Sequence, residues 1–201
     1  DIDIMFSEQL PDVAVAKNYY QLDFEAYAIA MFHPVTTEID QMEVYAQNFV
    51  DALLADHHNY LVVYPNNDLG SRLILKAYEA LNGNPRFRVI PSLRFEYFLT
   101  LLKNSQFIIG NSSAGIREAP YYGIPIINIG TRQQNRAVHA DILHVDYQKE
   151  AIGAALDTID IHKVNVGDSD FGQGNSAQLF LDCLQMTNFW QMNQQKQFRD
   201  L

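Results

Sequence analysis

The stretch that decides the fold runs through residues 107–129 and reads FIIGNSSAGIREAPYYGIPIINI. It opens with a short apolar run, passes through a loop of small and hydroxyl-bearing residues at 110–115, and closes with a second apolar run at 125–129. Apolar runs this short and continuous are typical of strands that are covered on both faces, as in a parallel sheet. The helical pattern at 116–122 between them therefore predicts a strand–helix–strand unit.

The same alternation extends through the rest of the chain. Further strands are predicted at residues 27–32, 60–64 and 87–90, and helices at 38–55, 71–81, 95–103 and from about 177 onward. The chain has 201 residues, of which 48% are hydrophobic, and this suits a single domain over residues 1–201. We therefore expect an α/β fold, with a Rossmann-like, doubly wound parallel sheet and helices on both faces.

Composition narrows the classes of partner. The formal net charge of −10 argues against nucleic acid, because phosphate binding needs basic patches. No apolar run approaches the roughly 20 residues that span a membrane, and no signal peptide is expected, although Asp1 rather than Met stands first. A lone Cys183 excludes an internal disulfide framework and a cysteine-based zinc site, and favours a reducing cytoplasm. The histidines show no metal-ligand spacing, so neither a metal nor a cofactor is predicted.

The loop at residues 110–115 is a candidate anion site. It directly follows a predicted buried strand and directly precedes a predicted helix. Small residues such as Gly115 let the backbone approach a ligand closely, Ser112 and Ser113 add hydroxyl donors, and amides at a helix start point outward. A plain strand–helix turn with a serine cap has the same composition, so the loop by itself leaves both interpretations open.

Polar residues also follow other predicted strands. His33 comes after the first, Asn67 after the second and Arg132 after the fifth, while Glu118 lies in the helix beyond the loop. Histidine and arginine can donate to phosphate, and a carboxylate can accept from vicinal hydroxyls such as those of ribose. Each also has an ordinary alternative as a turn residue, a surface arginine or an acid near a helix start. Because the carboxyl ends of parallel strands face one crevice, their convergence predicts a ligand site there.

Several stretches together resemble one enzyme family. They read HPVTT at residues 33–37, PNNDLGS at 65–71 and GNSSAGIREAPYYGIPIINIGTRQQNR at 110–136. In this order they are similar to the hydrolysing UDP-N-acetylglucosamine 2-epimerases of the sialic and legionaminic acid pathways. The stretch FGQGN at 171–175 resembles the family's late Tyr-Gly-Asp-Gly-Asn loop, with Gln173 in place of the usual aspartate.

The resemblance implies a fold and a set of roles. The family has two Rossmann-like domains in the GT-B arrangement, and this chain resembles the C-terminal domain, which holds the UDP of a UDP-sugar substrate. By resemblance, Ser112, Ser113 and the helix start hold the diphosphate with Arg132, and Glu118 holds the ribose. The implied UDP-binding set is completed by Gly115, Asn67, Arg94 and Phe95, the last two on the uracil side. His33, beside the diphosphate, is the implied catalytic residue and supports departure of UDP.

The family reaction eliminates UDP to give a glycal and then adds water, which inverts C2 of the sugar. The base at C2 belongs to the family's N-terminal domain, so that domain is the expected partner and the chain alone is expected to be inactive. Residues 33–37 lack the charges of the His-Arg-Arg-Glu-Asn string of non-hydrolysing relatives, which favours the hydrolysing branch. The identity of the sugar and assembly into a homo-oligomer stay open. The alternatives are a UDP-sugar-binding module without catalysis and the donor domain of a GT-B glycosyltransferase.

Overall fold

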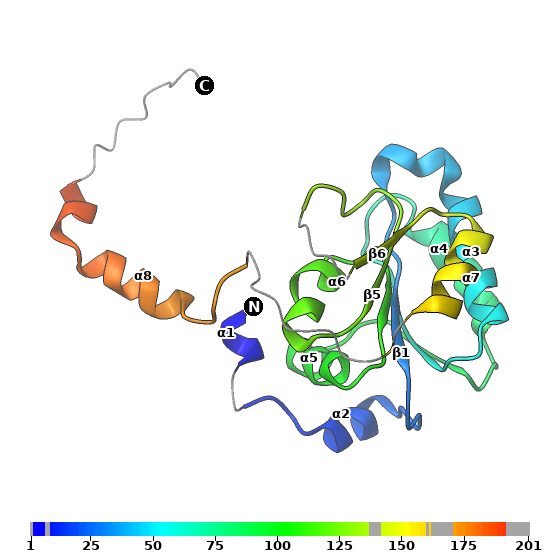
Figure 1. Cartoon of the computed structure of the whole chain (residues 1–201), viewed down its shortest axis with the longest axis horizontal. Coiled ribbons are helices and arrows are strands. Elements are labelled where there is room, and N and C mark those ends of the chain that lie inside the picture. Colours follow the sequence, from blue (N-terminus) through cyan, green and yellow to red (C-terminus); the bar gives the residue numbers. More distant parts are fainter. Residues whose placement is uncertain (1, 7–8, 137–141, 160, 162–170, 192–201) are drawn as a thin grey trace.

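The computed structural model describes residues 2–6, 9–136, 142–159, 161 and 171–191, and its centre is a six-stranded sheet (Figure 1). The strands are β1 (Ala28–Met31), β2 (Tyr60–Val63), β3 (Phe87–Ile90), β4 (Ile108–Gly110), β5 (Ile126–Ile129) and β6 (Ile142–Val145). Their order is β3-β2-β1-β4-β5-β6, and every neighbouring pair is parallel. This topology confirms the Rossmann-like α/β fold that the sequence predicts.

The edge strand β6 is the strand that the sequence analysis missed. Of its residues only Ile142 is buried, whereas Leu143 and His144 are exposed. Because β6 lies at the edge of the sheet beside β5, it does not need apolar side chains on both faces. It therefore lacks the continuous apolar run by which the other strands were recognised.

Helices cover both faces of the sheet. They are α1 (Ile2–Met5), α2 (Val13–Tyr20), α3 (Met42–Ala55), α4 (Ser71–Tyr78), α5 (Phe95–Lys103), α6 (Ala114–Arg117), α7 (Lys149–Thr158) and α8 (Ser176–Gln185), with short 3-10 turns η1 (Thr36–Gln41), η2 (Glu79–Leu81), η3 (Ala119–Tyr122) and η4 (Thr187–Gln191). Figure 1 shows α3, α4 and α7 on one face and α5 and α6 on the other. Each layer has its own apolar core, around Phe49 and Leu156 on the first face and around Leu99 and Ile116 on the second. The doubly wound arrangement is thus confirmed.

Three predicted helices are shorter than expected. The predicted helices 38–55 and 71–81 are α-helical only over Met42–Ala55 and Ser71–Tyr78, with 3-10 turns over the remaining residues, and the third difference matters for the site. Residues 116–122 do not form a single helix, because α6 ends at Arg117 and η3 follows it. Pro120 lies at the start of η3. Proline has no N–H to donate and its ring clashes with the preceding turn, so the α-helix cannot continue through it. The helix that begins at Ala114 therefore has a single turn, and its dipole is correspondingly small.

The described C-terminal segment stands apart from the sheet. None of the residues of α8 is buried, and the helix projects away from the α/β body (Figure 1). Near its start the Ser176 hydroxyl donates to an Asp3 carboxylate oxygen (2.5 Å), and the Tyr121 hydroxyl donates to the Gly172 carbonyl (2.5 Å). The segment that leads into α8 therefore lies beside α1. Across the described ranges, no helix has the length and apolar character needed to cross a bilayer.

Candidate functional site

The candidate site lies at the carboxyl ends of the central strands. β1 and β4 are neighbours, but the chain continues from β1 to α3 on one face and from β4 to α6 on the other. Such a switch point leaves a crevice in which α/β folds bind ligands. A pocket of about 490 Å³ lies there, a size common among small-molecule sites. Its wall brings together, among the predicted residues, His33, Asn67, Phe95, Ser113 and Glu118.

His33 follows β1 and is held in one orientation. Its ring Nδ1 accepts a hydrogen bond from the backbone N–H of Asn66 (3.0 Å), so the proton of the neutral ring resides on Nε2. Burial, together with the positive charge of Arg132, lowers the pKa of His33 to about 4, although the carboxylate of Asp68 opposes this. His33 therefore lines the pocket as a neutral imidazole that can donate from Nε2.

Asn111 is a site residue that the sequence analysis did not single out. Its side chain is fully buried, and both of its polar atoms bond to the backbone of His33. The His33 N–H donates to Oδ1 (2.6 Å), and Nδ2 donates to the His33 carbonyl (2.8 Å). The available signal was its place immediately after β4, where the strand ladder ends. The register that brings it opposite His33 is not visible in the sequence.

The serine loop lies partly in the pocket wall. Ser113 lines the pocket, whereas Ser112 lies against β4 and β5 and its Oγ accepts from the Ala114 N–H (3.3 Å). Gly115 faces the sheet, where an added Cβ would lie 3.2 Å from Ile126 Cγ2. The absence of a side chain at Gly115 thus lets α6 pack closely on β5. A ligand contact by Gly115 or Ser112 stays a prediction.

Glu118 is a buried acid in the pocket wall. It is only 6% exposed, and burial raises the pKa of its carboxyl group, while the neighbouring Arg117 opposes the rise. A buried carboxylate is costly unless donors surround it. Two hydroxyl groups of a ligand would supply such donors, so the position suits the predicted ribose contact.

The two predicted arginines are placed differently. Arg132, on the loop after β5, donates from Nη1 to the Asn111 carbonyl (3.1 Å) and is close enough to His33 to depress its pKa. Arg94 is the N-cap residue of α5, but its side chain is exposed and makes no capping hydrogen bond, and its backbone N–H donates to the Tyr20 hydroxyl (2.9 Å). Neither arginine lines the pocket. The phosphate contact of Arg132 and the uracil contact of Arg94 therefore stay predictions.

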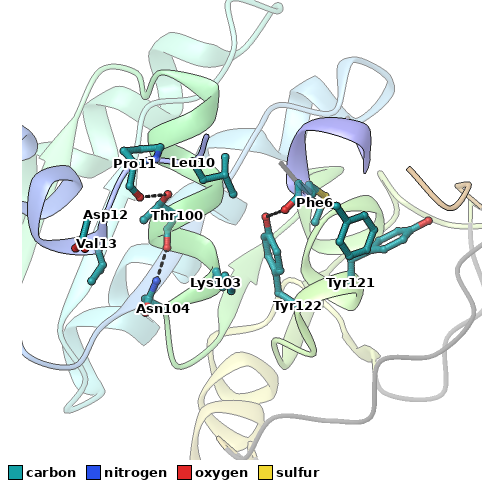
Figure 2. Close-up of a pocket in the computed structure, with 11 residues that line it drawn as sticks. Phe6, Leu10, Pro11, Asp12, Val13, Thr100, Lys103, Asn104, Tyr121 and Tyr122 are labelled. Atoms are coloured by element: carbon teal, nitrogen blue, oxygen red, sulfur yellow. Dashed lines mark hydrogen bonds between the residues drawn. The ribbon is translucent and has the colours of Figure 1, made fainter. Parts of the chain in front are cut away.

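A larger pocket, of about 750 Å³, lies elsewhere, between the segment before α2 and the helices α5 and η3 (Figure 2). Three of its polar side chains donate to backbone carbonyls. Thr100 Oγ1 donates to the Pro11 carbonyl (2.9 Å), Asn104 Nδ2 to the Thr100 carbonyl (2.8 Å), and the Tyr122 hydroxyl to the Met5 carbonyl (3.2 Å). None of the predicted site residues lines it. The smaller crevice at the switch point is therefore the better candidate despite its size.

A cluster of Asp56, His57 and His58 brings potential metal-ligand atoms within 4.8 Å of one another. The cluster precedes β2, so it lies at the amino ends of the strands, opposite the pocket at their carboxyl ends. Asp56 is already engaged, since one carboxylate oxygen accepts from the Tyr60 hydroxyl (2.6 Å) and from the His58 backbone N–H (2.8 Å). These bonds account for the arrangement as a local turn.

The strand order and the polar side chains at the switch point define a Rossmann-like α/β domain with a ligand crevice. Within that class, residues 2–185 match the family model described as UDP-N-acetylglucosamine 2-epimerase. The chain belongs to the UDP-N-acetylglucosamine 2-epimerase family. At this level the family that the sequence resembles is confirmed.

Named relatives agree with the family. The chain is 42% identical to a UDP-N-acetylglucosamine 2-epimerase of Neisseria meningitidis serogroup B, over 100% of this chain and 54% of the relative. It is 32% identical to a UDP-N,N'-diacetylbacillosamine 2-epimerase (hydrolyzing) of Legionella pneumophila, over 64% of this chain and 34% of the relative. The S. aureus MnaA–UDP co-structure shares the fold, with a TM-score of 0.67 and 18% identity over 98% of this chain and 53% of that one. The chain thus spans about half the length of the Neisseria relative.

Proposed function

We propose that residues 1–201 are the UDP-binding, C-terminal domain of a hydrolysing UDP-N-acetylglucosamine 2-epimerase with a GT-B fold. The complete enzyme would convert UDP-N-acetylglucosamine, or a UDP-2,4-diacetamido-6-deoxyglucose, and water to UDP and the 2-epimeric free sugar for sialic or legionaminic acid synthesis. One observation carries the proposal: in a member of the epimerase family, His33, Ser113 and Glu118 line one pocket at the switch point. We further infer a cytoplasmic setting, in keeping with a reducing compartment for Cys183.

The hydrolysing branch is supported by two observations. The Legionella relative carries the word hydrolyzing in its name, whereas the name of the more similar Neisseria relative has no such qualifier. Residues 33–37 read HPVTT and contain no arginine or glutamate, unlike the His-Arg-Arg-Glu-Asn string of non-hydrolysing enzymes. Thr36 and Thr37 are exposed and uncharged at the start of η1, and Glu38 is the next charged residue in the sequence.

The pocket residues His33 and Glu118, together with Arg132 on the neighbouring loop after β5, would act on different parts of the substrate. In the first step a base removes the proton from C2 while the bond from C1 to the UDP oxygen breaks, leaving a glycal. Negative charge then grows on the diphosphate, where Nε2–H of His33 and the guanidinium of Arg132 would donate to it. Glu118 would hold the ribose. In the second step water adds its hydroxyl to C1 and a proton returns to C2 from the other face. We assign the base to the half of the enzyme that this chain does not contain.

Binding of UDP by this chain tests the proposal. Calorimetry should give a dissociation constant between about micromolar and millimolar, since only one wall of the cleft is present. Glu118→Ala should weaken UDP and uridine by about 1–3 kcal/mol, because a charged hydrogen-bond partner of the ribose is lost. Binding of uracil, which has no ribose, should be unaffected.

The matched control is Glu150→Ala, which removes an exposed acid from α7 on the other face of the sheet. It should bind UDP as the wild type does. Absence of heat and of thermal stabilisation with about 10 mM UDP would refute the proposed function. Equal losses for uridine and uracil in Glu118→Ala would refute the ribose assignment alone.

A further inference from the structure

The ladder between β1 and β4 ends in an unusual way. On β1, the Ile29 N–H donates to the Phe107 carbonyl (3.0 Å). Two residues further along β1, the Met31 carbonyl accepts from the Asn111 N–H (3.0 Å). If the parallel ladder continued, the His33 N–H would next donate to the Asn111 backbone carbonyl. The chain instead turns away after Gly110 towards the serine loop. The backbone partners that His33 would have had are thereby lost.

The side chain of Asn111 takes the place of those backbone partners. Its Oδ1 accepts from the His33 N–H and its Nδ2 donates to the His33 carbonyl, at 2.6 and 2.8 Å. The amide thus supplies one acceptor and one donor, as a peptide group does. Aspartate has no donor when ionised, and a serine or threonine hydroxyl cannot make both bonds, so asparagine is the residue that fits.

Because the Asn111 side chain bonds to His33, the backbone carbonyl of Asn111 is available for other partners. That oxygen accepts from Arg132 Nη1 (3.1 Å) and from Gln133 Nε2 (2.8 Å), both on the loop after β5. One residue therefore bonds on one side to the backbone of His33 and on the other to the side chain of Arg132. Since Asn111 is 0% exposed, it has no surface with which to touch a ligand.

We propose that Asn111 is a positioning residue, which fixes His33 and Arg132 at the separation required by a diphosphate group bound between them. This inference rests on the proposed function, in which both residues act on the diphosphate. A fixed geometry matters because hydrogen-bond donors stabilise developing charge best when they do not have to reorganise. Asn66 completes the arrangement, because its backbone N–H holds the imidazole at Nδ1.

The test uses Asn111→Thr, which is neutral and of similar size but cannot make both bonds to His33. Its affinity for UDP should fall about tenfold or more, while its affinity for uridine, which lacks phosphate, should change less than about twofold. Nitrogen-15 NMR of the ligand-free chain should show the pKa of His33 rising towards the ordinary value as the ring becomes more hydrated. A merely structural role would lower the melting temperature without altering either result.

The matched control is Asn59→Thr, because Asn59 Nδ2 also donates to a backbone carbonyl, that of Ala26 (3.2 Å), but at the amino ends of β1 and β2, far from the pocket. The control should retain wild-type UDP affinity and His33 titration. If the wild type does not bind UDP, the proposed function fails, while the His33 titration still tests the positioning. If the wild type binds UDP and Asn111→Thr matches it in affinity and titration, the positioning role is overturned and the proposed function stands.

Failure of Asn111→Thr to fold would not end the test. Asn111→Ser, which leaves more space, is then measured in the same way. Hydrogen exchange of the wild-type chain needs no variant at all, since the His33 amide should be protected by its bond to Asn111. Exchange of that amide as fast as in an exposed turn would overturn the inference.

Discussion

The buried imidazole of His33 gives the fold a dependence on acid. An unfolded histidine takes up a proton near pH 6.5, whereas the folded His33 does so only near pH 4, because burial and Arg132 disfavour its charge more than Asp68 favours it. Between these values the unfolded state binds more protons, so stability is complete above about pH 6.5 and is lost as the pH falls towards 4. His33 accounts for a decrease of at most about 3 kcal/mol in the free energy of unfolding.

Urea unfolding at pH 7 and pH 4 measures this loss. His33→Asn can still accept from the Asn66 N–H but does not titrate, so it should lose about 3 kcal/mol less than the wild type on acidification. His57→Asn replaces a side chain that is 81% exposed and should follow the wild type. Equal losses in all three proteins would show that folded His33 is protonated as readily as the unfolded residue.

At the scale of single residues, the sequence predicted which side chains line the pocket better than it predicted the hydrogen bonds between them. His33 was identifiable because it directly follows an apolar strand, Ser113 because of its loop, and Glu118 because it lies in the predicted helix after that loop. The role of Asn111 was not, since it depends on a register between residues 78 apart in the chain. The depressed pKa of His33 likewise comes from burial and from Arg132, both of which are properties of the folded chain.

Among the elements, the end of β4 is held tightly against the backbone of β1. Gly110 has φ +132°, and an added Cβ would lie 2.0 Å from the Met31 carbonyl oxygen of β1. Gly110→Ala should therefore separate β1 from β4 and destabilise the fold by about 3 kcal/mol or more. Thermal and urea unfolding measure the effect.

Gly83→Ala provides the matched comparison for that element. Gly83 also has a positive φ, +76°, but an added Cβ there would meet nothing within 4 Å. Only backbone strain remains in Gly83→Ala, so its free energy of unfolding should decrease by about 1 kcal/mol. Similar losses in the two variants would mean that β1 can yield at Met31 and that the close approach of the strands is not limiting.

The helices and strands were predictable where their buried residues form a continuous apolar pattern in the sequence. Strands 60–63 and 87–90 and helix α5 agree closely with the apolar patterns. The pattern failed at β6, whose residues Leu143 and His144 face solvent, and in the helix after the serine loop, which Pro120 divides. Both failures come from position in the sheet or a single proline, rather than from misjudged hydrophobicity.

At the scale of the whole molecule, the proposed assignment of the base to another domain predicts that this chain alone does not turn over UDP-N-acetylglucosamine. Loss of general base catalysis removes about two to four powers of ten in rate, and loss of the second cleft wall removes positioning as well. Incubation with the substrate and assay for UDP and N-acetylmannosamine measure it. Turnover near that of a full-length relative would place the base within these residues.

The central position of β1 also has a consequence for synthesis on the ribosome. Ala28 pairs with Tyr60 of β2, but Ile29 must wait for Ile108 of β4 to leave the exit tunnel. A nascent half-sheet of β3, β2 and β1 would meanwhile leave the edge of β1 unpaired, which invites association with other chains. Arrival of β4 closes that edge and in the same event brings Asn111 against His33. The pocket is therefore completed only when the nascent edge is closed.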